Sequence, residues 1–195
     1  MNTPSHMLIG AALFARRDRP AATLAAFAGG LAPDLSLLAM AAWGAVAGGL
    51  ASHGAFEALY ASEAWQRVFA VDHSLVLWGA LALGAWLAGA PAPRAFAGSG
   101  LAHAATDVLL HHDDARRQLW PLSDAVFRSP VSYWDPRHFG DLVAPLEAGL
   151  AVLLAIALLR RLARWWERAL ALGLAAILLV PIALTGGFHG LHGMG

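Results

Sequence analysis

The chain lacks cysteine altogether, and few of its 195 residues are charged. Without cysteine, disulfides, thiolate metal ligands and cysteine nucleophiles are all excluded. Charged residues make up 13% and hydrophobic residues 58% of the sequence, whereas about a quarter of a soluble domain is charged. The 13 basic and 13 acidic residues give a formal net charge of zero, so the positive excess that attracts nucleic acid is missing. The composition therefore favours the lipid bilayer as a partner and argues against nucleic acid.

Several stretches approach the roughly 20 apolar residues that a membrane-spanning helix needs. They are residues 21–50, 74–90, 95–110, 142–159 and 169–184. The first is too long for one untilted crossing, and it is interrupted at Pro33, which cannot donate a backbone hydrogen bond. We expect a broken helix or a re-entrant pair there. The sequence thus predicts an all-α fold, an integral membrane helical bundle with about five or six membrane segments.

Three regions are too polar or too rich in glycine to cross a membrane. Residues 51–72 predict a modest loop with a short amphipathic helix. Residues 112–141 combine Pro, Asp and Arg with aromatic side chains, which favour the membrane interface, so we expect an interfacial loop there. Residues 186–195 predict a flexible tail rich in Gly and His. The whole chain, residues 1–195, is expected to form a single membrane domain.

The arginines predict an orientation in the membrane. The apolar run at residues 7–15 is followed, rather than preceded, by arginines, which is the reverse of a secretory signal. If residues 21–50 cross once, one side holds the arginines at positions 16, 17, 19, 94, 160, 161, 164 and 168. The positive-inside rule places that side, with the N terminus, in the cytoplasm and the candidate site toward the outer face. A hairpin at residues 21–50 would instead bring residues 112–141 to the cytoplasmic side.

A ladder of ionisable residues within an apolar stretch is the strongest functional signal, because burying such groups in lipid costs a few kcal/mol each. His103, Asp107 and His111 are spaced four apart, so they share one face of a helix. His and Asp at this spacing can hold one metal ion together, as His pairs do in helical zinc motifs. His103 and His111 are about 12 Å apart along the axis, so either Asp107 bridges two ions or only one histidine joins it. The alternative role of the ladder is hydrogen bonding between helices.

Four further ionisable residues extend this candidate site. Asp114 returns to the face of the ladder if the helix continues, while His6, Asp34 and His73 stand alone in apolar surroundings. Each has an ordinary alternative explanation, such as a satisfied polar group or, for Asp34, a helix cap. Together they supply the mixture of imidazole and carboxylate that suits zinc, with manganese as the alternative divalent ion.

Five short motifs resemble, in order and spacing, the membrane-bound metal-dependent hydrolases of the LexA-regulated YdjM type. They are Ser5-His6 followed by Gly10, Ala32-Pro33-Asp34, His73-Ser74, His103 with Asp107, and Leu119-Trp120-Pro121-Leu122-Ser123. The resemblance spans roughly residues 3–124. It implies a multi-pass protein of a bacterial-type inner membrane, with a divalent-metal site and hydrolase activity on a substrate that the family as a whole does not assign. The ligands that it implies are His6, Asp34, His73, His103 and Asp107.

The chain also departs from the pattern of this family. The family often has a second acidic residue two positions after the Pro-Asp pair, where this chain has Ser36. It commonly has a further histidine before His73, where Val68 and Phe69 stand. One ligand fewer predicts either a single metal ion or a protein that kept the fold and lost the chemistry.

An active site of this kind would use metal-bound water, because a divalent ion lowers the pKa of water and polarises a phosphoryl or acyl oxygen. We expect Asp34 or Asp114 to accept the proton, and Arg116 and Arg117 to clamp an anionic group. A site that opens at the bilayer surface favours an amphipathic substrate, so the prediction is a hydrolase of a lipid phosphoester. The alternative is a non-catalytic helical membrane protein whose His and Asp residues fix helix packing, bind metal or carry protons or ions.

Overall fold

The computed structural model describes residues 1–46 and 53–185, and within these ranges it is helical, with no β-strand. The elements are α1 (Thr3–Phe14), α2 (Pro20–Leu31), the 3-10 turn η1 (Ala32–Asp34), α3 (Leu35–Val46), α4 (His53–Tyr60), α5 (Glu63–Asp72), α6 (Leu75–Leu87), α7 (Pro91–Leu110), the 3-10 turn η2 (Pro136–His138), α8 (Gly140–Arg161) and α9 (Trp165–Thr185). The predicted all-α fold class is therefore confirmed for the described residues. The predicted tail at residues 186–195 lies outside them.

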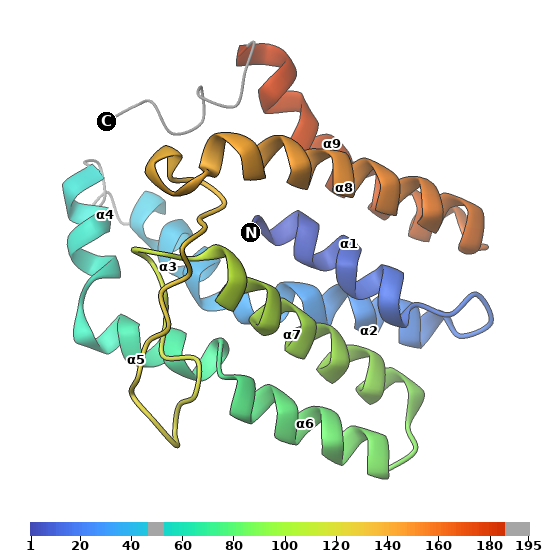
Figure 1. Cartoon of the computed structure of the whole chain (residues 1–195). Coiled ribbons are helices and arrows are strands. Elements are labelled where there is room, and N and C mark those ends of the chain that lie inside the picture. The colour runs from blue at the N-terminus through green and yellow to red at the C-terminus, as the bar shows by residue number, and fades with distance from the viewer. Residues whose placement is uncertain (47–52, 186–195) are drawn as a thin grey trace.

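Helices α1, α2 and α7 pack on one another and form the centre of the bundle. Figure 1 shows α6 beside α7 on one side of this group, and α8 and α9 beside α1 on the other. Small residues allow the close approach: a Cβ on Gly30 of α2 would lie only 2.7 Å from the His6 carbonyl oxygen and from the Met7 Cα in α1. Small residues at helix crossings are typical of membrane bundles, where tight packing replaces the hydrophobic effect.

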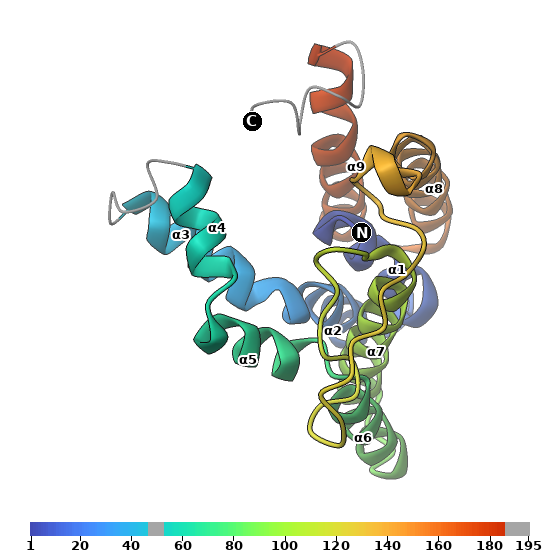
Figure 2. The same ribbon diagram turned by 60° about the vertical axis from the view of Figure 1, so that its left-hand side comes forward.

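The first apolar stretch forms a broken helix, which is one of the two expected alternatives. Because Pro33 cannot continue the ladder of backbone hydrogen bonds, α2 ends at Leu31, and η1 joins it to α3. In Figure 2, α3 and α4 leave the central bundle and form an arm that points away from α8 and α9. The break also leaves Asp34 at the inner end of this arm, where it faces the bundle.

Three helical stretches among the described residues are long and apolar enough to cross a membrane. They are Pro20–Gly44, Glu63–Leu87 and Gly140–Arg161. The expected number of five or six segments is not confirmed. Helix α7 has 20 residues, but Arg94, His103 and Asp107 lower its hydropathy.

The prediction for residues 51–72 was wrong in part. Residues 51 and 52 lie outside the described ranges, and the rest forms two helices, α4 and α5, rather than a loop with one short helix. Ser62 caps α5 by accepting a hydrogen bond from the Trp65 amide at 3.5 Å. Only two residues separate α5 from α6, so the two helices together form the second apolar stretch. Serine capping and the α3 contact of α5 outweigh the polar composition on which the loop prediction rested.

The segment between α7 and α8 is irregular apart from η2 and folds back over the end of α7. Tyr133 donates a backbone hydrogen bond to the Leu110 carbonyl at 3.0 Å, and the Ser129 hydroxyl donates to the Leu109 carbonyl at 2.6 Å. The Leu75 amide donates to the Gln118 carbonyl at 2.9 Å, which ties the same segment to the start of α6. These contacts hold the segment against the end of the bundle at which the ionisable ladder lies.

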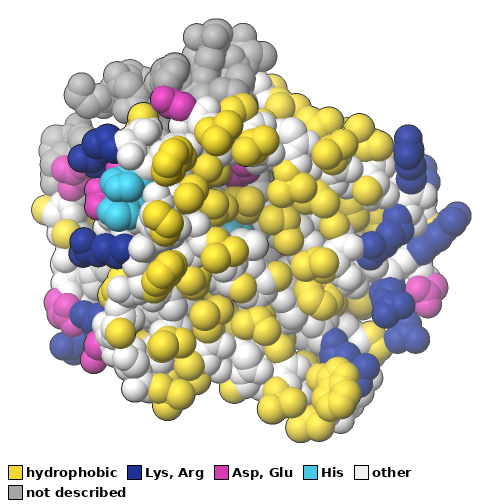
Figure 3. Space-filling model, viewed as in Figure 1, with side chains coloured by type: hydrophobic (Ala, Val, Ile, Leu, Met, Phe, Trp, Pro, Cys, Tyr) yellow, Lys and Arg dark blue, Asp and Glu magenta, His cyan; other side chains and the backbone are white. Residues whose placement is uncertain are grey.

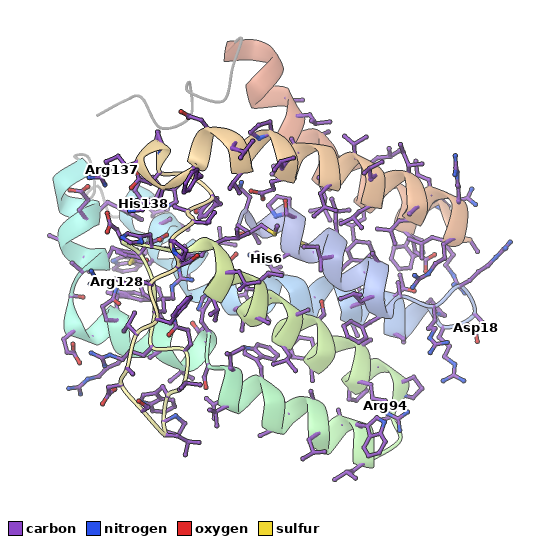
Figure 4. The ribbon with its side chains drawn as sticks, viewed as in Figure 1. His6, Asp18, Arg94, Arg128, Arg137 and His138 are labelled. Atoms are coloured by element: carbon purple, nitrogen blue, oxygen red, sulfur yellow. The ribbon has the colours of Figure 1, made fainter. Side chains whose placement is uncertain are left out.

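The surface separates apolar and charged regions along the bundle. Figure 3 shows a broad hydrophobic face between two charged ends. In Figure 4, Asp18 and Arg94 mark one end, formed by the α1–α2, α6–α7 and α8–α9 connections, while Arg128, Arg137 and His138 mark the other. This distribution and the three apolar stretches are those of a membrane protein.

The N-terminal residue lies beside the candidate site. The Met1 amine lies 3.3 Å from Asp107 Oδ1, within the bundle, and α1 runs from there to the arginines that follow Phe14. Met1 and these arginines therefore lie at opposite ends of α1, while the predicted membrane orientation stays a prediction. The physical reason is that α1, with only 12 residues, begins at the buried ladder instead of crossing past it.

Candidate metal centre

Four buried residues from three parts of the chain bring one potential ligand atom each within 4.8 Å of the others. They are Asp34 in η1, His73 between α5 and α6, and His103 and Asp107 in α7. Asp34 Oδ1 lies 3.5 Å from His73 Nε2 and 3.6 Å from His103 Nε2. Asp107 Oδ2 lies 3.5 and 3.3 Å from the same two nitrogens. We expected His73, His103 and Asp107 to meet, joined by Asp34 or His6, and the structure brings the three together with Asp34.

Local structure explains why these side chains meet. The four-residue spacing in α7 places His103 and Asp107 on one face, as the sequence predicted. The break at Pro33 brings Asp34 to that face. His73 is the C-cap of α5, and the neighbouring Ser74 caps α6 and also donates a hydrogen bond to the Trp120 carbonyl. The backbone around His73 is thus fixed from both sides.

The hydrogen bonds of the imidazoles show which ring nitrogens face the centre without a proton. His103 Nδ1 lies 2.8 Å from the Gly30 carbonyl, and His73 Nδ1 lies 3.3 Å from the Phe69 carbonyl. A carbonyl can only accept, so both Nδ1 atoms carry a proton, and in the neutral form of each ring Nε2 presents a lone pair. Within the described part of the chain, both Nε2 atoms are buried and have no hydrogen-bond partner.

A nitrogen lone pair and the carboxylate oxygen that it faces repel each other unless a cation lies between them. A buried polar atom without a partner is costly, and here two such nitrogens converge on the oxygens of Asp34 and Asp107. Backbone acceptors behind the histidines are also the usual way in which proteins orient metal-binding imidazoles. These residues therefore fit a divalent metal ion.

His6 and His111 approach the other oxygen of Asp107. His6 points from α1 toward α7 (Figure 4), and its Nε2 lies 2.9 Å from Asp107 Oδ1. His111 Nε2 lies 3.1 Å from the same oxygen. Both are outside the four-residue group, although the sequence proposed them as ligands of the same site. The Met1 amine shares this side, 3.1 Å from His111 Nε2.

Asp114 reaches the site by a different route from the one expected. Helix α7 ends at Leu110, so Asp114 cannot lie on the face of the ladder through a continued helix. The following turn brings it back, and its Oδ2 accepts from His111 Nδ1 at 2.7 Å and from Trp134 Nε1 at 3.2 Å. Burial alone would raise the pKa of Asp114, but its interactions with His111, Arg116 and Trp134 together outweigh burial and lower the pKa below its usual value. Asp114 is therefore an ionised carboxylate at the edge of the centre.

A cavity of about 320 Å³ leads away from the four-residue group. Its polar lining includes Asp34, Asp107, Asp114 and Arg116, and its apolar lining includes Leu37, Phe56, Tyr60, Tyr133 and Trp134. A second cavity of about 650 Å³ shares Phe56, Tyr60, Asp114 and Arg116 with the first. The two cavities therefore adjoin at these four residues.

The structure separates the two adjacent arginines that the sequence proposed as an anion clamp. Arg116 is buried, with Nη1 3.5 Å from Asp107 Oδ2 and its guanidinium over the Phe69 ring. Its Nε has no hydrogen-bond partner among the residues that the structure describes. Arg117 points away and pairs with Glu63, with Nη2 3.2 Å from Oε2. Only Arg116 lies at the centre.

Sequence reasoning missed the groups that support the ligands. Thr3 donates to Asp34 Oδ2 at 2.5 Å, the Gly30 carbonyl orients His103, and Thr106 Oγ1 lies 3.2 Å from His6 Nδ1. The sequence offered one weak signal, because Thr106 directly precedes Asp107. Hydroxyl residues are too common beside acidic ones for that signal to single out Thr106.

Asp34, His73, His103 and Asp107 thus form a buried group that could hold a metal ion. A comparison of the chain with protein-family models, curated proteins and solved structures finds no match.

Proposed function

We propose that this protein is a membrane-bound, divalent-metal-dependent hydrolase that acts on a phosphoester of an amphipathic or lipid substrate. The observation that supports the proposal most strongly is the pair of buried, unpartnered Nε2 atoms of His73 and His103, which face two carboxylates. The motif resemblance to the YdjM-type hydrolases is consistent with this proposal. Zinc is the ion that the mixture of imidazole and carboxylate suits best, with manganese as the alternative.

The ligands would be Asp34, His73, His103 and Asp107. A bound divalent ion would supply activated water and polarise the oxygen of the scissile bond. Asp34 is an unsuitable proton acceptor, because Oδ1 faces the histidines and Oδ2 accepts from Thr3. Asp114 is suitable, because it lines the cavity and its Oδ1 has no hydrogen-bond partner in the described ranges. We therefore assign the acceptance of the proton to Asp114.

Arg116 indicates that the proposed substrate is anionic. A buried guanidinium with an unpartnered Nε, lining the same cavity as the ligands, can bind the nonbridging oxygens of a phosphoryl group. The apolar cavity wall formed by Leu37, Phe56 and Tyr60 suits the hydrophobic part of an amphipathic molecule. Both features favour an anionic ester of an amphipathic alcohol.

The proposed setting is a bacterial-type inner membrane, with five or six membrane segments and the arginine-rich end of the bundle in the cytoplasm. The absence of cysteine permits a direct test with single-cysteine variants. Asp18 and Asp124 have exposed side chains and come from the two ends of the bundle. An impermeant maleimide added to intact cells should label Asp124→Cys, whereas Asp18→Cys should react only after permeabilisation. Labelling of Asp18→Cys alone would reverse the orientation.

The catalytic proposal is tested with the full chain purified in detergent without chelators. We expect stoichiometric zinc or manganese by elemental analysis, and metal-dependent hydrolysis of bis(p-nitrophenyl) phosphate. Arg116→Gln should raise KM roughly tenfold to a hundredfold, because a charge-assisted hydrogen bond is lost. Arg117→Gln is the matched control and should leave KM near the wild-type value.

Two outcomes would contradict the proposal. Purified protein without bound metal, with a melting temperature indifferent to chelator, would leave the ionisable residues as polar contacts between helices. Bound metal without hydrolysis, together with ion flux in proteoliposomes, would favour a transporter.

A further inference from the structure

Asp107 presents its two oxygens to two different sets of groups. Oδ2 faces His73, His103 and Arg116, at 3.3 to 3.5 Å. Oδ1 faces His6 Nε2 at 2.9 Å and His111 Nε2 at 3.1 Å. A carboxylate with separate partners on each oxygen has the arrangement of a bridge between two cations.

The second set has the same proton arrangement as the first. His111 Nδ1 lies 2.7 Å from Asp114 Oδ2, an oxygen that also accepts from Trp134 Nε1, so His111 Nδ1 carries the proton of this contact. Thr106 Oγ1 lies 2.9 Å from the Ala102 and His103 carbonyls, to which its hydroxyl donates, so it accepts from His6 Nδ1 at 3.2 Å. When both rings are neutral, their Nε2 lone pairs face Asp107 Oδ1.

Burial adds an independent sign of a missing cation. His6 is 1% exposed, and its Nε2 has no hydrogen-bond partner within the part of the chain that the structure describes. Its ring is stacked on His103 with centroids 3.6 Å apart, so it cannot turn away without disturbing a ligand of the first set. Both nitrogens lie close to Oδ1, at 2.9 and 3.1 Å, so each can share a cation with that oxygen.

We propose that a second divalent cation binds on the Oδ1 side, held by His6 Nε2, His111 Nε2 and Asp107 Oδ1, with Asp107 bridging the two ions. This inference rests on the proposed metal function of the first set. In this arrangement the Asp114 carboxylate orients His111, in addition to its role at the cavity. A carboxylate behind a metal-bound histidine is a common arrangement. The competing occupant is the Met1 ammonium, which lies 3.3 Å from the same oxygen.

Charge predicts that the second ion binds more weakly than the first. One divalent ion together with Arg116 balances the carboxylates of Asp34, Asp107 and Asp114. A second ion adds positive charge, which an anionic ligand in the adjoining cavity would offset. Inorganic phosphate should therefore tighten binding of the second ion.

The test is a manganese titration of the full chain in detergent, with and without inorganic phosphate. We expect two ions per chain at saturation and the electron paramagnetic resonance signal of a spin-coupled pair. His111→Gln and His6→Gln should each bind one ion and lose the coupling. His112→Gln is the matched control, since His112 is the next residue but bonds to the Ser129 carbonyl at 2.6 Å, and it should bind two ions.

The outcomes distinguish this inference from the proposed function. Binding of no ion would overturn both. Saturation at one ion in the wild type, with phosphate present, would overturn only the second position and leave the ammonium as its occupant. Two coupled ions that persist in His111→Gln, or loss of both ions in that variant, would exclude His111 as a ligand specific to the second position.

Discussion

Two clusters of aspartate and histidine among the described residues, one buried in the bundle and one at the surface, differ in how completely their polar atoms are paired. In the candidate metal centre, buried histidine nitrogens face Asp34 and Asp107 without hydrogen-bond partners in the described ranges. In the loop cluster, which we define as Asp135, Arg137 and His138, Asp135 accepts from the Arg137 amide at 3.0 Å, from Arg137 Nε at 3.1 Å and from His138 Nδ1 at 2.9 Å. A cluster completed by protein groups stabilises structure, whereas an incomplete one indicates a missing ligand.

The origins of the two clusters differ in the same way. The loop cluster comes from neighbouring residues in and beside η2, so local chain geometry is enough to form it. The residues of the metal centre are far apart in the chain, from Asp34 to Asp107, and they meet only when η1 packs against α5 and α7. Changes at the centre should therefore alter ligand binding, and changes in the loop cluster should alter stability alone.

The largest expected effect is the loss of metal binding in Asp107→Asn. An amide keeps the size and hydrogen-bonding capacity of the acid but loses the charge that faces both sets of histidines, so metal affinity should fall on the order of 100-fold or more. Elemental analysis and melting with and without chelator measure this effect. Because a ligand stabilises only the state that binds it, chelator should lower the melting temperature of the wild type and leave Asp107→Asn unchanged. An unchanged metal content in Asp107→Asn would remove the distinction between the clusters.

A smaller effect on both folding and metal binding is expected for Gly30→Ala. The new Cβ would lie 2.7 Å from the backbone of His6 and Met7, and overpacking of this kind costs about 1–3 kcal/mol in the free energy of unfolding. The Gly30 carbonyl that orients His103 would also shift, so metal affinity should fall. Gly149→Ala in α8 is the control, because a Cβ there meets nothing within 4 Å and should stabilise the helix by about 0.5–1 kcal/mol. Equal melting temperatures for both variants would show that the α1–α2 crossing is looser than the structure indicates.

The smallest effect is expected for Asp135→Asn, which should lower the melting temperature without changing metal content. Hydrogen bonds from Arg137 and His138 hold the pKa of Asp135 well below its usual range. A carboxylate whose pKa is lower in the folded state stabilises the protein above its unfolded pKa, about 3.9, and loses this contribution as the pH falls toward the folded pKa.

The difference in melting temperature between wild type and Asp135→Asn should consequently be constant from about pH 7 to about pH 5 and shrink below about pH 4. Thermal unfolding across this range measures it. A loss of metal in Asp135→Asn would contradict the separation of the two clusters.

The sequence by itself determined the features that depend on local geometry and composition. A high apolar content predicted membrane helices, the missing amide of Pro33 predicted the break in the first stretch, and the four-residue spacing placed His103 and Asp107 on one helix face. Each of these follows from the backbone of a single segment, so no packing information was needed.

Only the tertiary structure decided how distant groups are paired. It separated the four proposed histidine ligands into two pairs around the two oxygens of Asp107. It also buried Arg116 while pairing Arg117 with Glu63, and returned Asp114 to His111 through a turn instead of a continued helix. Neighbouring residues such as Arg116 and Arg117 have nearly equal local environments in the sequence. Their different roles arise from the direction in which the α7–α8 segment presents each side chain to helices far away in the chain.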